Sequence, residues 1–443
     1  MERIRTFISM PEPCFTLGVE ERAARSRLLW DSCAGRVAAS VRPFSKAEQH
    51  RREAAYDEGV RSVERELKFP ALTSVAAEAR ENRILEAFGH FAALALGLEP
   101  EAIRMIREEF VPAGIELARW AERFDSELDR IEIVQACRNA WTACGLQPLL
   151  GCTTQLTPSI LAYSLMYPYS DNFLDREDVR PETKRRFSAR FRDRLCGAAP
   201  AAANRTESAL WTLVGMVEDE FPRRDFPQVF EGMLAIHAAQ ERSVAQLRNG
   251  SGCTDNEVLA ISCLKGGSSV LADAVFARGG VTEAEALFAF DWGVLLQLGD
   301  DLQDLRDDLR RNSATLFTRA VRRREPLDAL VRQLLAFCDA VGHEMRALPH
   351  ATPMLCNLLK MSWRSLIVEA VAEIQEHFSR EFLNELEGAS PFRLKFLRVR
   401  HNRLRKRRGL YSRLLDALFD APHQPDLRLP VPRFEEILRS AAD

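Results

Sequence analysis

Two groups of aspartates carry most of the chemical information in this chain of 443 residues. The first group is Asp171 and Asp175, and the second begins at Asp300. The long separation between them leaves room for several helices to bring the two groups face to face. Opposed carboxylates repel one another unless cations lie between them, and Mg²⁺ prefers carboxylate and phosphate oxygens as ligands. The two groups therefore predict metal-dependent chemistry on a diphosphate.

The second group follows a helix that the sequence predicts to be buried. Residues 283–298 are apolar on nearly every face, which is typical of a helix inside a protein. Asp300, Asp304 and Asp308 follow at helical i, i+4, i+8 spacing and share one stripe, with Asp301 beside them. Like charges at this spacing repel, and burial strengthens the repulsion. A solvated acidic helix end is the alternative, but the buried helix before it favours a metal site.

The first group has a lining of aromatic residues beside it. Asp171 and Asp175 lie four residues apart, so both carboxylates face one side of a helix. Tyr167 and Tyr163 lie one and two turns earlier on the same stripe, and such a lining suits a lipid-like substrate. Pro168 lacks an N–H and predicts a kink just before the aspartates. Taken alone, the pattern also fits a solvated helix face.

Lys265 precedes two glycines inside an otherwise good helix over residues 258–276. A helical glycine costs about 0.5–1 kcal/mol, so Gly266 and Gly267 need an explanation. A close backbone approach or a break facing a cavity would supply one, and Lys265 would then reach the cavity. The alternative is a lysine that only marks a helix end.

These residues resemble the class I isoprenoid synthases, which include trans-prenyltransferases and terpene synthases. The second motif of the prenyltransferases has Gly, then Gln four residues later, then Asp-Asp-x-x-Asp. This sequence matches it position for position, with Gly293, Gln297, Asp300, Asp301 and Asp304. The resemblance implies a metal site on this segment.

The first motif of that family is matched only in part. Asp171 and Asp175 fit its aspartates, and Arg180 fits the first arginine that follows them. Asn172 stands where the family has a second aspartate, and Pro181 where it has a second arginine. The resemblance is therefore specific at the second motif alone.

Two further segments extend the resemblance over about residues 131–320. Lys265 resembles the family lysine that holds the diphosphate, and residues 308–316 resemble the run after the second motif without its Gly-Lys pair. The resemblance implies about three Mg²⁺ ions and an allylic prenyl diphosphate as substrate. The expected catalytic residues are Asp171, Asp175, Asp300, Asp301 and Asp304, with Asp308 as a further metal ligand. The expected substrate contacts are Arg180, Lys265, Gln297, Arg310, Arg311, Tyr163, Tyr167 and Phe173.

A basic segment that is missing upstream of the first motif distinguishes between the reactions of this family. Chain-elongating prenyltransferases carry a basic segment upstream of the first motif that grips a second diphosphate. Between residues 131 and 171 this chain has one arginine, Arg138, and no lysine. We therefore expect a terpene synthase that ionises one allylic diphosphate to a carbocation and releases a terpene plus diphosphate. A polyprenyl diphosphate synthase or head-to-head condensing enzyme is the alternative, and a non-catalytic helical partner subunit is an alternative of another class.

The whole sequence predicts an all-α protein. Hydrophobic residues make up 46% of the chain, strand-like runs are few, and no βαβ alternation occurs. We expect a single large helical bundle of the isoprenoid synthase type. Its parts would be an N-terminal helical extension of the same bundle over 1–130, a catalytic core over 131–387, and a basic C-terminal helix and tail over 388–443.

The net charge and the cysteines indicate which partners and which cellular compartment to expect. A net charge of −3 argues against a nucleic-acid partner, and ten scattered cysteines are typical of reduced thiols in a cytoplasmic protein. The sequence shows no run of about 18 apolar residues, so we expect no membrane span. Basic and apolar residues alternate over 393–413. A solvated helix there, a peripheral membrane contact through this tail, and a homodimer all stay open.

Overall fold

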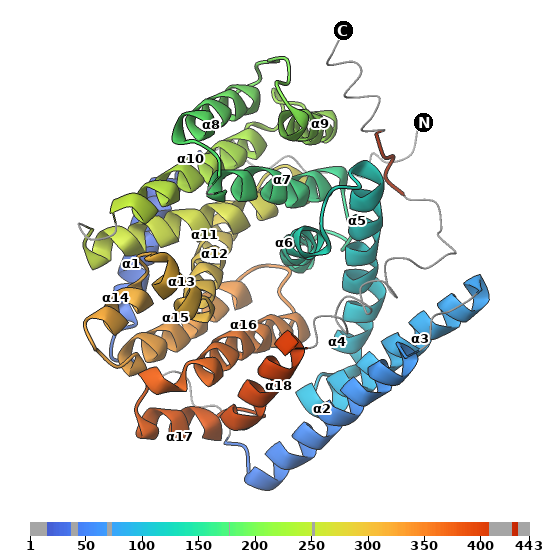
Figure 1. The fold of residues 1–443 in the computed structure, drawn as a ribbon, viewed down its shortest axis with the longest axis vertical. Helices are drawn as coiled ribbons and strands as arrows, with labels where there is room; N and C mark the ends of the chain where they lie inside the picture. Colours follow the sequence, from blue (N-terminus) through green and yellow to red (C-terminus); the bar gives the residue numbers. More distant parts are fainter. Residues whose placement is uncertain are drawn as a thin grey trace.

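The fold is taken from a computed structural model, which describes residues 16–36, 43–68, 73–176, 178–249, 253–406 and 428–432. Every regular element in these ranges is a helix, and they contain no strand. The prediction of an all-α protein is therefore confirmed. Figure 1 shows the helices gathered into one bundle around α11 and α12.

Two apolar helices form the centre of the bundle. Helix α11 (Asp255–Arg278) packs along α12 (Glu283–Gln303), and each begins with a capping box, at Thr254 and Thr282. Gly279, in the left-handed conformation with φ 86°, ends α11 and allows the turn between them. Around this pair lie α6 (Arg130–Leu149), α7 (Pro158–Asp175), α10 (Pro227–Asn249), α15 (Asp328–Arg346) and α16 (Pro353–Glu373). Helices α8 (Pro181–Leu195) and α9 (Arg205–Glu220) lie farther out, beyond α10 and α7 (Figure 1).

The remaining helices cover the centre or extend from it. Helix α1 packs against α11, α12 and α15, whereas α2 and α3 lie side by side as a long pair along one edge (Figure 1). Their bounds are α1 (Val19–Ser32), α2 (Lys46–Glu66), α3 (Ser74–Phe91), α4 (Pro100–Met105) and α5 (Val111–Phe124). The later helices are α13 (Leu305–Arg311), α14 (Leu316–Arg322), α17 (Arg380–Gly388) and α18 (Leu394–Lys406).

The glycines of α11 allow its backbone to touch that of α12. A Cβ atom on Gly266 would lie 2.3 Å from the carbonyl oxygen of Gly293, and one on Gly293 would lie 2.0 Å from the carbonyl oxygen of Gly266. A Cβ on Gly267 would lie 2.4 Å from the ring of Phe290. Helix α11 continues unbroken through both glycines. A close backbone approach, and not a break, therefore explains them.

The aspartate segments differ in detail from the simple helices that the sequence predicts. Helix α7 continues through Pro168 to Asp175, so the proline does not end it. Helix α12 stops at Gln303, and α13 begins at Leu305. The amide of Asp304 still donates to the carbonyl of Asp300 at 2.8 Å, and that of Asp308 to the carbonyl of Asp304 at 2.9 Å. The i, i+4, i+8 relation therefore survives the change of helix.

Helix α11 is long and apolar enough to pass a simple test for a membrane span, although the sequence predicts no span. Among the residues that the structure describes, this helix alone meets that test by length and composition. Most of it is buried inside the bundle, where it packs against α6, α10 and α12.

Helix α18 contains the part of the basic tail that the structure describes. Leu394 and Leu397 are buried in a small apolar cluster, so one face of the helix is covered by the protein. Arg400 pairs with Asp57 on α2. Residues 407–413 lie outside the described ranges, and a membrane contact through the tail stays a prediction.

The substitution Gly293→Ala tests the contact between α11 and α12. Its Cβ would collide with a backbone oxygen that cannot turn away, so we expect the free energy of unfolding to fall by about 1–3 kcal/mol or more. Equilibrium urea unfolding followed by circular dichroism measures this change.

Gly215→Ala in α9 is the matched control. No atom lies within 4 Å of its added Cβ, so its stability should stay level or rise by about 0.5–1 kcal/mol. Equal stability of the two variants would contradict the close contact.

Candidate functional site

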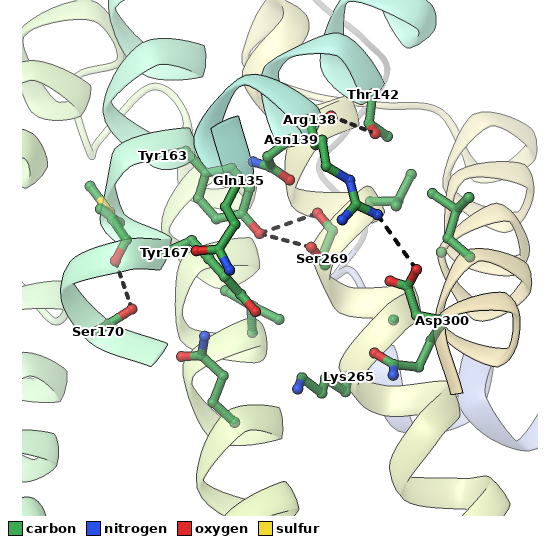
Figure 2. Close-up of a pocket in the computed structure, with 18 of the residues that line it drawn as sticks. Gln135, Arg138, Asn139, Thr142, Tyr163, Tyr167, Ser170, Lys265, Ser269 and Asp300 are labelled. Atoms are coloured by element: carbon green, nitrogen blue, oxygen red, sulfur yellow. Dashed lines mark hydrogen bonds and ion pairs between the residues drawn. The ribbon is translucent and has the colours of Figure 1, made fainter. Parts of the chain in front are cut away.

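A cavity of about 460 Å³ opens between the helices that carry the predicted site residues. Its wall is formed by residues from α6, α7, α8, α10, α11, α12 and α16, with Asp304 at the end of α12. Figure 2 shows side chains from several of these helices directed into one space. Small-molecule sites typically enclose about 300–1,000 Å³, so the cavity has the size of a ligand site.

Six of the residues that the sequence predicts as metal ligands or substrate contacts line this cavity. They come from three helices that are distant in the sequence and adjacent in the fold. The six are Tyr163 and Tyr167 of α7, Lys265 of α11, and Gln297, Asp300 and Asp304 at the end of α12. Lys265 precedes Gly266, the residue at which α11 touches α12. Lys265 therefore lies across from the helix that carries the aspartates.

Asp300 faces an arginine from α6. A guanidinium nitrogen of Arg138 lies 3.6 Å from a carboxylate oxygen of Asp300, and both side chains are half-exposed to the cavity. The surrounding protein withdraws solvent and raises the pKa of Asp300, and the charge of Asp304 adds to this rise. Arg138 and Lys265 act in the opposite direction. Asp300 therefore carries a charge that its neighbours compensate only in part.

Asp301 points away from the cavity, although it is adjacent to Asp300 in the motif. It is buried and accepts hydrogen bonds from Ser262 Oγ at 3.1 Å and Gln297 Nε2 at 2.8 Å. Burial raises the pKa of Asp301 to about 7, and the charge of Asp308 contributes. In this structure Asp301 joins α12 to α11.

Asp304 and Asp308 continue the acidic stripe beyond α12. Burial raises the pKa of Asp304, while Arg138, Arg311 and Lys265 lower it. Burial also raises the pKa of Asp308, to about 6, and the neighbouring charge of Asp304 adds to the effect. The acidic rim, defined as Asp300, Asp304 and Asp308, therefore consists of three carboxylates whose charged form burial disfavours. A divalent cation would favour their charged form, but the three side chains as they stand are not arranged to hold one.

The second group of carboxylates, expected on α7, is not found at the cavity wall among the described side chains. Asp171 is buried, with 6% of its surface exposed, and lies outside the cavity wall, whereas Ser170 beside it lines the wall. The side chain of Asp175 lies outside the part of the chain that the structure describes. Within the described residues, no group of three or more acidic, histidine or cysteine side chains is arranged to hold a metal ion. The face-to-face arrangement of the two groups stays a prediction.

Four expected substrate contacts lie away from the cavity. The ring of Phe173 packs against that of Phe187, with centroids 4.5 Å apart. Arg180 precedes α8 and is exposed, and Arg310 is paired with Asp307. Arg311 is exposed, although its charge reaches Asp304 and Asp308.

A polar stripe on α6 also lines the cavity, and it was not predicted from the sequence. Gln135, Arg138, Asn139 and Thr142 all line the cavity, while Ala136, Cys137 and Ala140 on the other faces are buried. The spacing i, i+3, i+4, i+7 of polar residues in an otherwise apolar helix could have revealed this stripe. It also changes the expected lining, because amide groups lie beside the aromatic and thioether side chains.

Comparison with known proteins gives little further guidance. No protein-family model matches the sequence, and no curated protein matches it. A solved structure with some likeness is that of a decaprenyl diphosphate synthase from Rhodobacter capsulatus. It covers 68% of this chain and 98% of its own, with a TM-score of 0.31 and 13% identity, values that establish neither family nor function.

The buried carboxyl group of Asp273, next to the cavity wall, predicts a pH dependence of stability. Asp273 is fully buried, and its carboxylate accepts a long hydrogen bond of 3.4 Å from Asn139 Nδ2. Burial raises its pKa well above the ordinary value of about 3.9. Above that ordinary value the folded state therefore binds more protons than the unfolded state. Stability should fall as pH rises, by up to about 1.4 kcal/mol per pH unit.

Asp273→Asn removes this titrating group at nearly the same size. We expect the variant to lose less stability than the wild type between pH 5 and pH 8, as measured by urea unfolding at both values. Identical losses in the two proteins would show that Asp273 is ionised in the folded state throughout this range.

Proposed function

We propose that this protein is a Mg²⁺-dependent class I terpene synthase, which ionises an allylic prenyl diphosphate and releases a terpene plus diphosphate. The observation that carries the proposal is the acidic rim beside two cations on one cavity. Asp300 and Asp304 line the same space as Lys265 and Arg138. Carboxylates for metal ions and cations for phosphate oxygens, adjacent to one another, suit a metal-bound diphosphate.

The acidic rim would hold the Mg²⁺ ions, about three in number by resemblance to the family. Asp300 and Asp304 line the cavity, and Asp308 continues their stripe. Asp301 would first have to exchange its hydrogen bonds with Ser262 and Gln297. Asp171 and Asp175 would contribute from α7. Bound Mg²⁺ would neutralise the diphosphate and favour its departure.

Arg138 and Lys265 would bind the diphosphate oxygens. Negative charge grows on the leaving oxygen as the carbon–oxygen bond breaks, so fixed cations stabilise the transition state more than the substrate. Arg138 now faces Asp300, and it would become available to phosphate once a metal ion takes over that carboxylate. The arginine would thus serve as counter-ion for Asp300 in the metal-free protein and for the diphosphate in the complex.

The other walls of the cavity would enclose the prenyl chain. Met166, Met233 and Ile236 supply apolar surface, and Tyr163 and Tyr167 supply aromatic rings. A ring face stabilises a nearby cation by about 0.5–2 kcal/mol. Phe173 and Phe290 do not serve here, because Phe173 packs on Phe187 and Phe290 is fully buried against Gly267.

The charges of the cavity favour one diphosphate over two. Among the described residues that line it, the lysine and arginine side chains are Lys265 and Arg138 alone. His237 also lines it, but burial lowers its pKa and keeps the ring neutral near pH 7. A condensing enzyme would need further cations for a second anionic substrate.

Incubation with allylic diphosphates of several chain lengths and Mg²⁺ tests this proposal. A terpene synthase releases inorganic diphosphate and a terpene from a single substrate. Longer diphosphates formed only with isopentenyl diphosphate would instead establish an elongating enzyme. Absence of turnover and of Mg²⁺ binding would leave the non-catalytic subunit.

The substitution Asp300→Asn should lower kcat by about 10²–10³, because one charged group at the reacting centre is worth roughly that factor. Asp307→Asn is the matched control, since Asp307 is exposed and paired with Arg310 in the same segment. Diphosphate release measures both. Equal activity of the two variants would remove the acidic rim from the mechanism.

Asp171→Asn tests the contribution of α7. If Asp171 moves to bind metal in the complex, this variant should also lose most of its diphosphate release and require more Mg²⁺ for half-maximal rate. Wild-type rate and wild-type Mg²⁺ dependence would show that Asp171 is a structural residue of α7.

A further inference from the structure

The part of the cavity next to the aromatic lining is polar. Gln135 and Asn139 from α6, Tyr163 from α7 and Ser269 from α11 line it together, and we refer to these four residues as the inner polar wall. Figure 2 shows the polar ends of Gln135, Tyr163 and Ser269 near one another, on the side of the cavity away from Asp300. A cavity that only shielded a carbocation would have apolar groups at these positions.

Gln135 is the member of the inner polar wall that most requires a ligand. Its Oε1 atom is buried and has no hydrogen-bond partner from the described protein atoms. Leaving a buried acceptor without a donor destabilises the protein. Water commonly satisfies such groups where the site is polar and roomy, and this cavity of about 460 Å³ is both.

The side chains of Tyr163 and Asn139 make long hydrogen bonds to other described residues. Tyr163 Oη lies 3.3 Å from the carbonyl oxygen of Ser269 and 3.4 Å from its Oγ atom. Asn139 Nδ2 lies 3.4 Å from both Ser164 Oγ and Asp273 Oδ1. These distances exceed the usual range of about 2.7–3.2 Å. The wall therefore keeps the capacity to bind water with shorter hydrogen bonds.

We propose that water held by the inner polar wall captures the carbocation, so that the product of this enzyme is a terpene alcohol. This inference rests on the proposed function and narrows it from terpene products in general to hydroxylated ones. Gln135 Oε1 would accept a hydrogen bond from the water and leave an oxygen lone pair directed at the cation. Gln135 thus acts as a positioning residue.

The step balances without any further reactant. The bond between the allylic carbon and the diphosphate oxygen breaks, and its electron pair leaves with the diphosphate. A lone pair of water forms the new carbon–oxygen bond. The released diphosphate accepts the proton, so that substrate and water become alcohol and hydrogen diphosphate.

Turnover in H₂¹⁸O tests the capture step. Substrates that release diphosphate should give an alcohol that carries ¹⁸O on carbon, detected by mass spectrometry as a gain of about two mass units. Hydrocarbon products alone would overturn the inference while leaving the proposed function intact. An alcohol without ¹⁸O, with the label in phosphate instead, would show cleavage at phosphorus and overturn both.

Gln135→Leu tests the role of the wall, because leucine has a similar size and cannot hold water. We expect the ratio of alcohol to hydrocarbon to fall at least tenfold. Gln303→Leu, at the end of α12 and outside the inner polar wall, is the matched control and should keep the wild-type ratio. Equal ratios in the wild type and Gln135→Leu would overturn the assignment of Gln135.

A crystal structure of the free protein provides a test that does not depend on turnover. Ordered water within hydrogen-bond distance of Gln135 Oε1, lost in Gln135→Leu, is the expected result. A dry inner wall in the wild type would contradict the inference even if alcohol formed. Failure of every allylic diphosphate to react would contradict the proposed function, and the water would then mark a site for another polar ligand.

Discussion

The contact between the backbones of α11 and α12 is the constraint on which the cavity depends. Gly266 and Gly293 meet so closely that a single Cβ atom on either would overlap a carbonyl oxygen of the other. This contact fixes the axial register of the two helices. Lys265, beside one glycine, and Gln297, one turn after the other, therefore line the same cavity. A wider helix pair would separate the lysine from the acidic rim.

The burial of three neighbouring carboxylates is the second constraint. Burial raises the pKa of Asp300, Asp304 and Asp308, and nearby cations offset this only in part. These carboxylates do not stabilise the fold, because they repel one another in the folded protein. A ligand that supplies positive charge turns the same arrangement into binding energy. The ion pair between Arg138 and Asp300 fits this view, since it can exchange one partner for a metal ion and the other for a phosphate.

Helical periodicity within one segment predicts well which of its residues share the face that lines the cavity. Asp300 and Asp304 line the cavity because a four-residue spacing keeps them on one face. Periodicity cannot show which face of one helix meets another, so Asp301 turned out to contact Ser262, and the contribution of α6 was missed. Phe173 packs on Phe187 of α8, and this contact depends on the path of the chain after α7. These outcomes depend on tertiary packing, which local patterns do not encode.

Calorimetric titration with Mg²⁺ and inorganic diphosphate tests the central claim most directly, because it needs no knowledge of the prenyl chain. If the acidic rim and the two cations form one site, each ligand should bind weakly alone and at least tenfold more tightly in the presence of the other. Independent binding, or no binding of either ligand, would contradict a shared metal–diphosphate site in this cavity.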